Sequence, residues 1–328
     1  MSRLRFLTRR ALFALFATYL VVSITFGFIA LTADPQLAVV AYGAAQAPPG
    51  EYYNQSEAAE QVNEAVSAYE EAYNLDEPVE KRYVTWLVNV ATFDWGESLH
   101  RDRAVVAMVG EAVPKTAAYV LPAMLLSLVG GISAGVFAAY RRRSAGDYLV
   151  TGLGYLAFSV PNFLLGGLAL LGLALLTAAE GRPGLPLPTE VRTVVLPALV
   201  LGGSLFAGQL RHARSEALEH FGEAFVKLLR AKGAGPVRVA RHVLKNAAIP
   251  LVSLFFAELL AVLVVNIYVL EQVFRIQGLG SLSLWAIGER DLPVVLGTTM
   301  VLVFVGIAGN FLQDVAYAFL DPRVEEER

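Results

Sequence analysis

The sequence predicts an all-α integral membrane protein with six transmembrane helices. Hydrophobic residues make up 56% of the 328 residues and charged residues only 17%, whereas about 25% of a soluble domain is charged. Uncharged runs near the roughly 20 apolar residues that cross a bilayer recur along the whole chain. Because the chain has no cysteine, disulfides, thiolate metal sites and cysteine nucleophiles are excluded.

The sequence contains six apolar runs, and the first of them has two interpretations. We expect spans at residues 11–33, 116–140, 148–179, 193–210, 246–270 and 292–313. The first has an alternative interpretation as a cleaved signal peptide, because arginines precede it and Ala45-Gln46-Ala47 resembles a signal-peptidase site. The run is longer than the 7–15 residues, roughly, of a signal-peptide apolar region, so a retained anchor is favoured.

The charges predict the orientation of these spans. Basic residues gather at the N-terminus, at Arg141-Arg142-Arg143 and over 211–245, whereas acids crowd the segment 34–115. With six spans all basic segments fall on one side, which the positive-inside rule assigns to the cytoplasm. Both termini are therefore expected in the cytoplasm and 34–115 outside. Within that outer segment, 57–73 reads as a helix with one apolar face, made by Val62, Ala65, Val66 and Tyr69.

Polar or helix-breaking residues interrupt two of the spans. The run 148–179 is too long for one straight crossing at about 1.5 Å per residue, and Pro161 removes a helical hydrogen bond inside it. Such a break either kinks an ordinary helix or lines a cavity. Glu258 is an acid within a span, which indicates function by default. Alternatively, Glu258 pairs with a hydrogen-bond donor on a partner subunit or lies shallow enough in the membrane to reach water. Asn162 and Asn266 are polar residues within spans too, and the same interpretations apply to them more weakly.

The basic loop after the fourth span has helical order. Helix formers run over 216–232, Gly233 offers a C-cap, and Gly235-Pro236 starts a second helix with proline at its first position. In that second helix one face is expected to be basic and the other apolar, with Arg238, Arg241, His242 and Lys245 opposite Val237, Ala240, Leu244 and Ala247. A solvated loop, a lipid-binding loop and a protein-docking loop all remain open, but this geometry favours docking.

Several motifs together resemble one family. RAKG at 230–233, RH at 241–242 and KNAAIP at 245–250 resemble the EAA-type loop of ABC importer permeases, in the dipeptide, oligopeptide and nickel branch. The similarity continues along the chain in NLDEPVEKRYVTWL at 74–87, FDWGESLHRDRAV at 93–105, SVPNF at 159–163, EQVFRIQGLGSL at 271–282, RDLPVVLG at 290–297 and DPR at 321–323. The chain departs from the pattern at Gln277, where the family has proline, and at Lys227-Leu228-Leu229, where the EAA letters would stand.

The resemblance implies a type I ABC importer-like permease fold and a set of partners. It implies a multi-pass protein of the cell membrane, half of a heterodimer with a homologous permease subunit. Two cytoplasmic ATPase subunits and an extracytoplasmic substrate-binding protein would complete the transporter. The solute would be a di- or oligopeptide, with nickel or another small solute as the alternative. Membrane lipids would also contact the chain, and no nucleic acid partner is expected.

This family assigns roles to regions and residues. The expected regions are 1–33 with the first span, the extracytoplasmic segment 34–115, and a five-helix core 116–328 that carries the coupling loop 211–248. In that loop the ATPase would contact Glu223, Ala224, Lys227, Arg230, Ala231, Lys232, Gly233, Arg241, His242, Asn246 and Pro250. The translocation pathway would include Ser159, Pro161, Asn162, Phe163, Glu258 and Asn266. An extracytoplasmic loop would depend on Glu271, Phe274, Gly278 and Gly280.

Enzymatic alternatives find little support in the residues. The chain has no G-x-x-x-x-G-K-[ST] phosphate loop, so we expect it to bind no cofactor and to leave ATP and magnesium to its partners. An intramembrane hydrolase would need a base at membrane depth, yet His100, His212, His220 and His242 fall in loops or at span ends. A secondary transporter would usually show inverted repeats, and none is visible. A membrane scaffold is not favoured either, and no metal site is expected.

Overall fold

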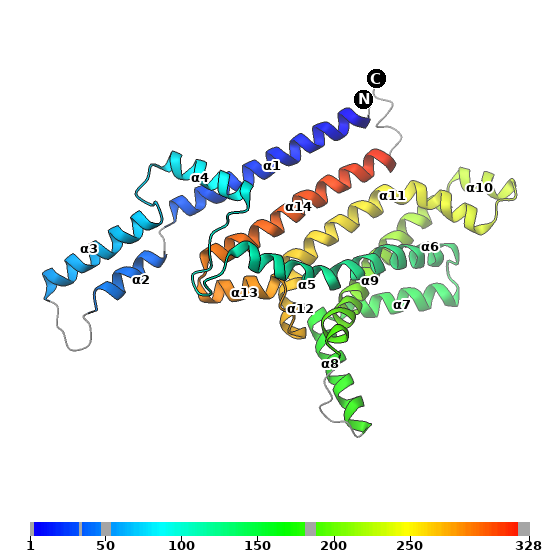
Figure 1. The fold of residues 1–328 in the computed structure, drawn as a ribbon. Helices are drawn as coiled ribbons and strands as arrows, with labels where there is room; N and C mark the ends of the chain where they lie inside the picture. The colour runs from blue at the N-terminus through cyan, green and yellow to red at the C-terminus, as the bar shows by residue number, and fades with distance from the viewer. Residues whose placement is uncertain (1–2, 33–34, 47–53, 181–187, 321–328) are drawn as a thin grey trace. The chain divides into compact units, whose positions relative to one another are not determined.

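The computed structural model describes residues 3–32, 35–46, 54–180 and 188–320, and these are almost entirely helical (Figure 1). Among these residues, six helical segments are long and apolar enough to cross a membrane, as predicted. They are Leu4–Ala44, Val105–Tyr140, Asn162–Ala179, Val191–Phe221, Pro236–Phe274 and Leu292–Leu320. The possible peptidase site ending at Ala47 and the DPR motif at 321–323 lie wholly or partly outside the described residues.

The chain forms two compact units. One contains Met1–Ala14 and Gly96–Arg328, and the other contains Leu15–Trp95. Helix α1 (Arg3–Leu31) passes from one unit to the other without a break. The units therefore divide the chain differently from the regions ending at residues 33 and 115, which concern the side of the membrane and stay predictions.

The Leu15–Trp95 unit contains the end of α1 together with α2 (Pro35–Ala44), α3 (Gln55–Ala72) and α4 (Val79–Thr92). The helix expected at 57–73 is α3, and it begins with a capping box. The Asn54 side chain accepts the Glu57 N–H at 3.0 Å, and the Glu57 carboxylate accepts the Asn54 N–H at 3.0 Å. Its predicted apolar face is half-buried. Helix α4 packs on α1, where the Trp86 indole N–H donates to the Val22 carbonyl at 3.1 Å.

In the larger unit, one long helix organises the packing. Helix α5 (Val105–Leu125), the π-helical stretch η1 (Leu126–Gly131) and α6 (Ile132–Tyr140) follow one another as a continuous helix of 36 residues. Helix α9 (Leu196–Phe221), which follows η2 (Val191–Val195), packs along it. Their backbones approach closely at Gly135, where a Cβ would lie 2.5 Å from the Leu210 carbonyl oxygen. Small residues allow such close helix contacts in membranes.

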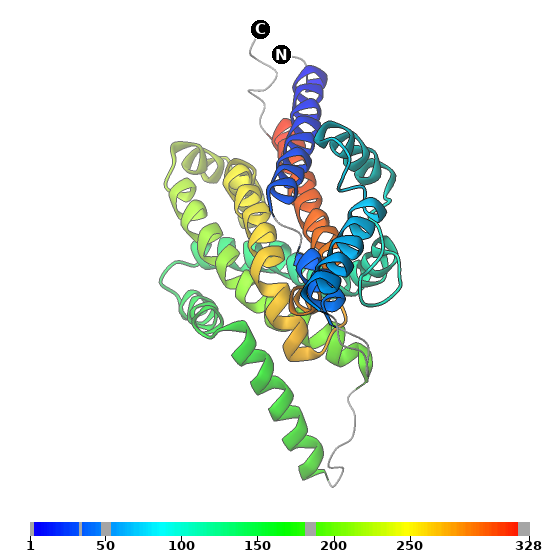
Figure 2. The same cartoon turned by 90° about the vertical axis from the view of Figure 1, so that its left-hand side faces the viewer.

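The third apolar run is broken at Pro161, as predicted, but the part that can cross a membrane is shorter than the expected 148–179. The run divides into α7 (Ala145–Ser159) and α8 (Asn162–Ala179), and only α8 is long and apolar enough to cross. Val160 between them is extended, with φ −100° and ψ 125°, because a residue before proline is pushed out of the helical region. In Figures 1 and 2, α8 diverges from the helices of its own unit.

The C-terminal half combines short helical elements with two long helices: α10 (Ala224–Ala231), α11 (Pro236–Ala261), η3 (Val262–Asn266), α12 (Ile267–Phe274), α13 (Leu279–Glu289) and α14 (Leu292–Leu320). Helices α11 and α14 pack together, and the Ser253 and Tyr317 hydroxyls are hydrogen-bonded between them. Near its end α14 also meets the beginning of α1, through an Arg10–Asp314 ion pair of 3.5 Å. We call the end of the unit that carries α10 the α10 end (Figure 1).

Several helix bounds correct the prediction. The helix that contains the second predicted span begins at Val105, before the apolar run at 116, and includes Glu111 and Lys115 in its first turns. The single helix expected at 216–232 is broken at Gly222 and Glu223, between α9 and α10. Glycine is the poorest helix former after proline, and the break lets α10 fold back onto its neighbours.

The main core lies where α5, α9 and α12 meet. Tyr119, Leu201 and Phe274 are fully buried there, together with Ile267 and Leu270. This core fixes α12 and therefore the loop that follows it, which belongs to the candidate site below.

Candidate functional site

Helix α10 is a short helix between the long helices α9 and α11, and its C-terminal end is capped. Gly233 follows its C-cap with φ +75°, a conformation that glycine adopts without steric cost. The Gly233 N–H donates to the Arg230 carbonyl at 2.9 Å, and the Ala234 N–H donates to the Leu229 carbonyl at 3.0 Å. These two bonds form a Schellman motif, so the C-cap predicted at Gly233 is present.

The two faces of α10 differ sharply. Val226 is 0% exposed and packs with Ala139 of α6, Ala217 of α9 and Val239 of α11. On the other side Leu228 is 56% exposed, and the remaining exposed residues are Ala224, Lys227, Arg230 and Ala231. Helix α10 is thus packed firmly against α6, α9 and α11 through its buried face, and its other face exposes both apolar and basic side chains.

The first turns of α11 continue this surface. Arg238, Arg241, His242 and Lys245 are all exposed, as the basic face requires. The prediction that Val237 and Leu244 belong to a buried apolar face is wrong, because Val237 is 81% exposed and Leu244 38% exposed. The residues that pack inward are Val239, Val243 and Ala247, which lie four apart on one side of the helix.

The other coupling residues are placed nearby. Glu223 is the N-cap residue just before α10, and its carboxylate lies 2.6 Å from the His220 ring nitrogen Nδ1. Lys232 is the C-cap residue of α10. Asn246 is exposed on α11, and Pro250 lies half-buried inside that helix.

An ion pair at the α10 end was missed by the sequence analysis. Asp147, at the start of α7, is almost fully buried and accepts bonds from Arg214 Nε at 2.8 Å and Nη2 at 2.9 Å. The Arg143 backbone N–H adds a third bond at 2.9 Å. The Arg214 hydrogen bond is the main reason that the pKa of Asp147 falls to about 2. The only available signal was an acid following an arginine run, which does not identify its partner.

Two of the predicted pathway residues meet each other. Asn162, which begins α8, donates from Nδ2 to Asn266 Oδ1 at 2.8 Å. Asn266 ends η3, and single π-helical turns often mark functional sites. The hydrogen bond therefore joins the start of α8, just after the break that follows α7, to the π-helical turn η3 between α11 and α12.

The remaining pathway residues have separate neighbours. Glu258 accepts a bond from Gln209 Nε2 of α9 at 2.9 Å, so its partner lies in the same chain. The Ser159 hydroxyl donates to the Tyr155 carbonyl of its own helix at 2.7 Å. Pro161 precedes α8, and the Phe163 side chain is 53% exposed.

The loop between α12 and α13 is built around Glu271, which is 0% exposed. Its Oε1 accepts the Thr116 hydroxyl at 2.6 Å, and its Oε2 accepts the Ser281 N–H at 2.7 Å. Thr116 Oγ1 in turn accepts the Leu279 N–H at 2.8 Å. The first N–H groups of α13 are thus capped by side chains of α5 and α12. The predicted loop residue Glu271 meets a residue of α5 that the sequence did not single out.

The two predicted glycines of this loop lie against other groups. At Gly278 a Cβ would overlap the Glu271 carboxylate and would lie 2.5 Å from Thr116 Oγ1. At Gly280 it would lie 2.7 Å from the Ile267 carbonyl carbon. Phe274 is fully buried in the main core. The four predicted loop residues therefore form one packed turn.

Asp291, another buried acid, lies just before α14. Asp291 is 0% exposed, and its Oδ2 accepts the Ser98 hydroxyl at 2.6 Å. Ser98 Oγ accepts the Arg101 N–H at 3.1 Å. The segment before α5 is thereby tied to the turn between α13 and α14, and neither residue was predicted as a site residue.

Among the described residues, one segment matches the serine hydrolase pattern G-x-S-x-G but lacks the backbone turn that the pattern requires. GISAG at 131–135 matches the letters of G-x-S-x-G, but Ser133 lies inside the continuous helix α6. The hydrolase pattern requires a sharp strand-to-helix turn at the serine. Within the described ranges, no group of three His, Asp or Glu residues is arranged to hold a metal ion.

The sequence is similar to a known protein family and to several known proteins. Residues 131–326 match the family described as binding-protein-dependent transport system inner membrane component. The dipeptide transport system permease protein DppB of Bacillus subtilis is 32% identical over 284 residues, which cover 84% of this chain and 89% of the relative. The oligopeptide transport system permease protein AppB of the same organism is 31% identical over 264 residues, 78% of this chain and 83% of the relative.

Proposed function

Since this chain belongs to the family of binding-protein-dependent transport system inner membrane components, we propose that it is the permease subunit of an ATP-driven importer of di- and oligopeptides. The relatives named above are permeases of peptide transport systems, which favours peptides over nickel or another small solute. Family members are transport subunits, so ATP and magnesium would be bound by partner subunits. A homologous second permease would complete the pathway.

The packing of helix α10 is the main support for a role in coupling this chain to an ATPase. The inner face of α10 packs on α6, α9 and α11 at once, so a force on its outer face would reach three membrane helices. Its outer face exposes Leu228 beside cationic residues. Exposed apolar groups rimmed by polar ones mark interaction sites, and a cleft on a cytoplasmic ATPase would bury them.

The position of α10 also predicts the orientation of the chain in the membrane. If α10 faces the cytoplasm, Arg141-Arg142-Arg143 and the basic turns of α11 lie there too, in accord with the positive-inside rule. The ends of α1 and α14 near the Arg10–Asp314 pair would share that side, and both termini would be cytoplasmic. The opposite end of the unit would face a binding protein that delivers the solute. Asn162, Asn266 and Glu258 would border the pathway between.

The proposal is tested in the assembled transporter, reconstituted in liposomes with its ATPases and the binding protein. Peptide uptake should require ATP and the binding protein. Gly233→Pro should leave membrane insertion intact but abolish substrate-stimulated ATPase activity, because proline cannot adopt φ +75° and the α10 cap would be lost. Gly235→Ala is the matched control, since Gly235 has φ −68° and open space for a Cβ.

Three results would contradict the proposal. Normal ATPase stimulation in the Gly233→Pro complex would remove the coupling role. Uptake by this chain in liposomes without ATPases would exclude the ABC mechanism. Uptake of nickel but of no peptide would reassign the solute.

A further inference from the structure

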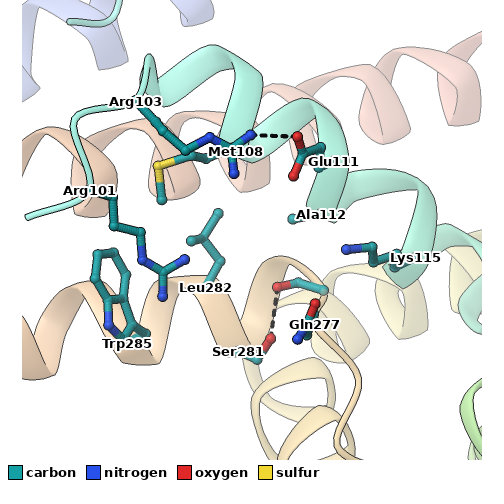
Figure 3. Close-up of a pocket in the computed structure, with 11 residues that line it drawn as sticks. Arg101, Arg103, Met108, Glu111, Ala112, Lys115, Gln277, Ser281, Leu282 and Trp285 are labelled. Carbon is teal, nitrogen blue, oxygen red and sulfur yellow. Dashed lines mark hydrogen bonds and ion pairs between the residues drawn. The ribbon is translucent and has the colours of Figure 1, made fainter. Parts of the chain in front are cut away.

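A small cleft opens between the first turns of α5, the start of α13 and the segment before α5 (Figure 3). Its volume is about 250 Å³. Three cationic side chains line it, from Arg101, Arg103 and Lys115, against the single acid Glu111. The cleft therefore carries an excess of positive charge.

Only one of these cations is neutralised within the cleft. Arg103 Nη2 lies 2.5 Å from Glu111 Oε1. Arg101 and Lys115 form no ion pair with any described residue, and Figure 3 shows both side chains directed toward the cleft. The cleft therefore has two positive groups available to an anion from outside.

The Arg101 guanidinium is held in place before any ligand arrives. Its carbon lies 3.6 Å from the centroid of the Trp285 ring, a cation–π contact that leaves its N–H edge available. A positioned arginine loses less side-chain freedom when it binds a carboxylate through paired hydrogen bonds. The Gln277 side chain, exposed on the cleft wall, adds a neutral donor.

The cleft is too small for a typical ligand pocket but suits one side chain. Small-molecule sites commonly measure about 300–1,000 Å³, more than the volume found here. Met108 and Leu282 give it an apolar floor, which matches the methylene groups of an aspartate or glutamate.

The cleft also lies at the end of the unit opposite α10. Met108 and Lys115 are in the first turns of the 36-residue helix from Val105 to Tyr140, whereas Ala139 at its far end packs on α10. At about 1.5 Å per residue this helix spans on the order of 50 Å. If α10 meets the ATPase in the cytoplasm, the cleft faces outward.

We propose that this cleft receives an acidic side chain of the extracytoplasmic protein that delivers the solute. The inference rests on the proposed function for the identity of that side of the membrane. The carboxylate would bind between Arg101 and Lys115, beside the Trp285 ring. Since Gly278 and Ser281 of the Glu271 loop line the same cleft, the docked acid would contact the turn that joins α5, α12 and α13.

The test uses the complete transporter in nanodiscs and the purified binding protein that supports its uptake of peptide. Binding of that protein is measured by its dissociation constant at several salt concentrations. Lys115→Glu and Arg101→Glu should each raise the constant at least about tenfold and weaken its dependence on salt, because they remove attraction and add repulsion. Gln277→Asp should act in the same direction, since it adds a charge at an exposed position without changing packing.

Arg290→Glu is the matched control. Arg290 is exposed at the end of α13 and does not line the cleft, so the same charge reversal there should leave binding unchanged. Equal affinity of the unaltered complex and all three cleft variants would overturn the proposal. It would also be overturned if a free peptide bound the complex without the binding protein and lost binding on amidation of its C-terminus, because the cleft would then be a solute site. Uptake by the unaltered complex tests the proposed function separately.

Discussion

The Glu271 carboxylate caps helix α13 from another helix, because its Oε2 accepts the Ser281 backbone N–H at 2.7 Å. Ser281 is the third residue of α13 and has no partner for this N–H within its own helix. The carboxyl group also lies at the positive end of that helix dipole. One buried acid thus fixes both the start of α13 and its contact with Thr116 of α5.

Replacing Glu271 with glutamine should destabilise the protein by about 2 kcal/mol. Both carboxylate oxygens accept hydrogen bonds, whereas an amide offers one acceptor and turns its NH₂ toward a donor. The midpoint of thermal unfolding in detergent measures the loss. Glu97→Gln is the control, since Glu97 is exposed, and its midpoint should match the parent protein. A Glu271→Gln midpoint equal to that of the control would refute the capping role.

The close contact at Gly278 predicts a contrast with another glycine of the same region. Gly278→Ala forces a Cβ against Glu271 and Thr116 and should destabilise the protein by about 1–3 kcal/mol. Gly288→Ala places a methyl group in open space on α13 and should be neutral or stabilising by up to about 1 kcal/mol. Unfolding of the two variants in detergent, side by side, distinguishes local packing from a general effect of glycine replacement.

The Asp147–Arg214 pair predicts a pH dependence in acid. The folded-state pKa of Asp147 is about 2, below its ordinary value of 3.8. The pair therefore contributes its full stability above about pH 4 and loses it as the pH falls toward 2. Unfolding temperatures measured in detergent over this range should fall more steeply in the parent protein than in Asp147→Asn. Parallel curves would show that the pair is not formed.

The Asn162–Asn266 hydrogen bond predicts a measurable coupling between two helices. In a double-mutant cycle, Asn162→Ala and Asn266→Ala should be non-additive by about 0.6 kcal/mol, the average for such bonds in membranes, and by at most about 1.7 kcal/mol. Unfolding in detergent of the two single variants and the double variant gives the coupling. Ser159→Ala with Asn266→Ala serves as the control cycle and should be additive, because the Ser159 hydroxyl bonds within its own helix.

Local features were predictable from the sequence because they depend on neighbouring residues alone. The six apolar segments, the cap at Gly233 and the helix start at Pro236 all follow from composition and spacing, and the structure has each of them. Errors arose where local propensity gave no unique answer. The sequence 216–232 contains good helix formers with a single glycine at Gly222, which does not by itself decide whether the helix continues, and the structure has a break there that lets Val226 pack against three helices.

Partners of buried polar residues could not be predicted in the same way. Glu271 and Asn266 were identified as unusual residues, but nothing local shows that one meets Thr116 and the other Asn162. These pairs are separated by 155 and 104 residues. Asp147 with Arg214 and Ser98 with Asp291 were overlooked for the same reason.

By itself the sequence determined the membrane-spanning character, the basic loop and its turn chemistry, because hydrophobic length and backbone preference are carried by consecutive residues. Only the tertiary structure decided which acids are buried against which donors, and that Arg101 and Lys115 share a cleft without a carboxylate of their own. A buried charge must find a partner somewhere in the fold, and the packing of distant helices determines where.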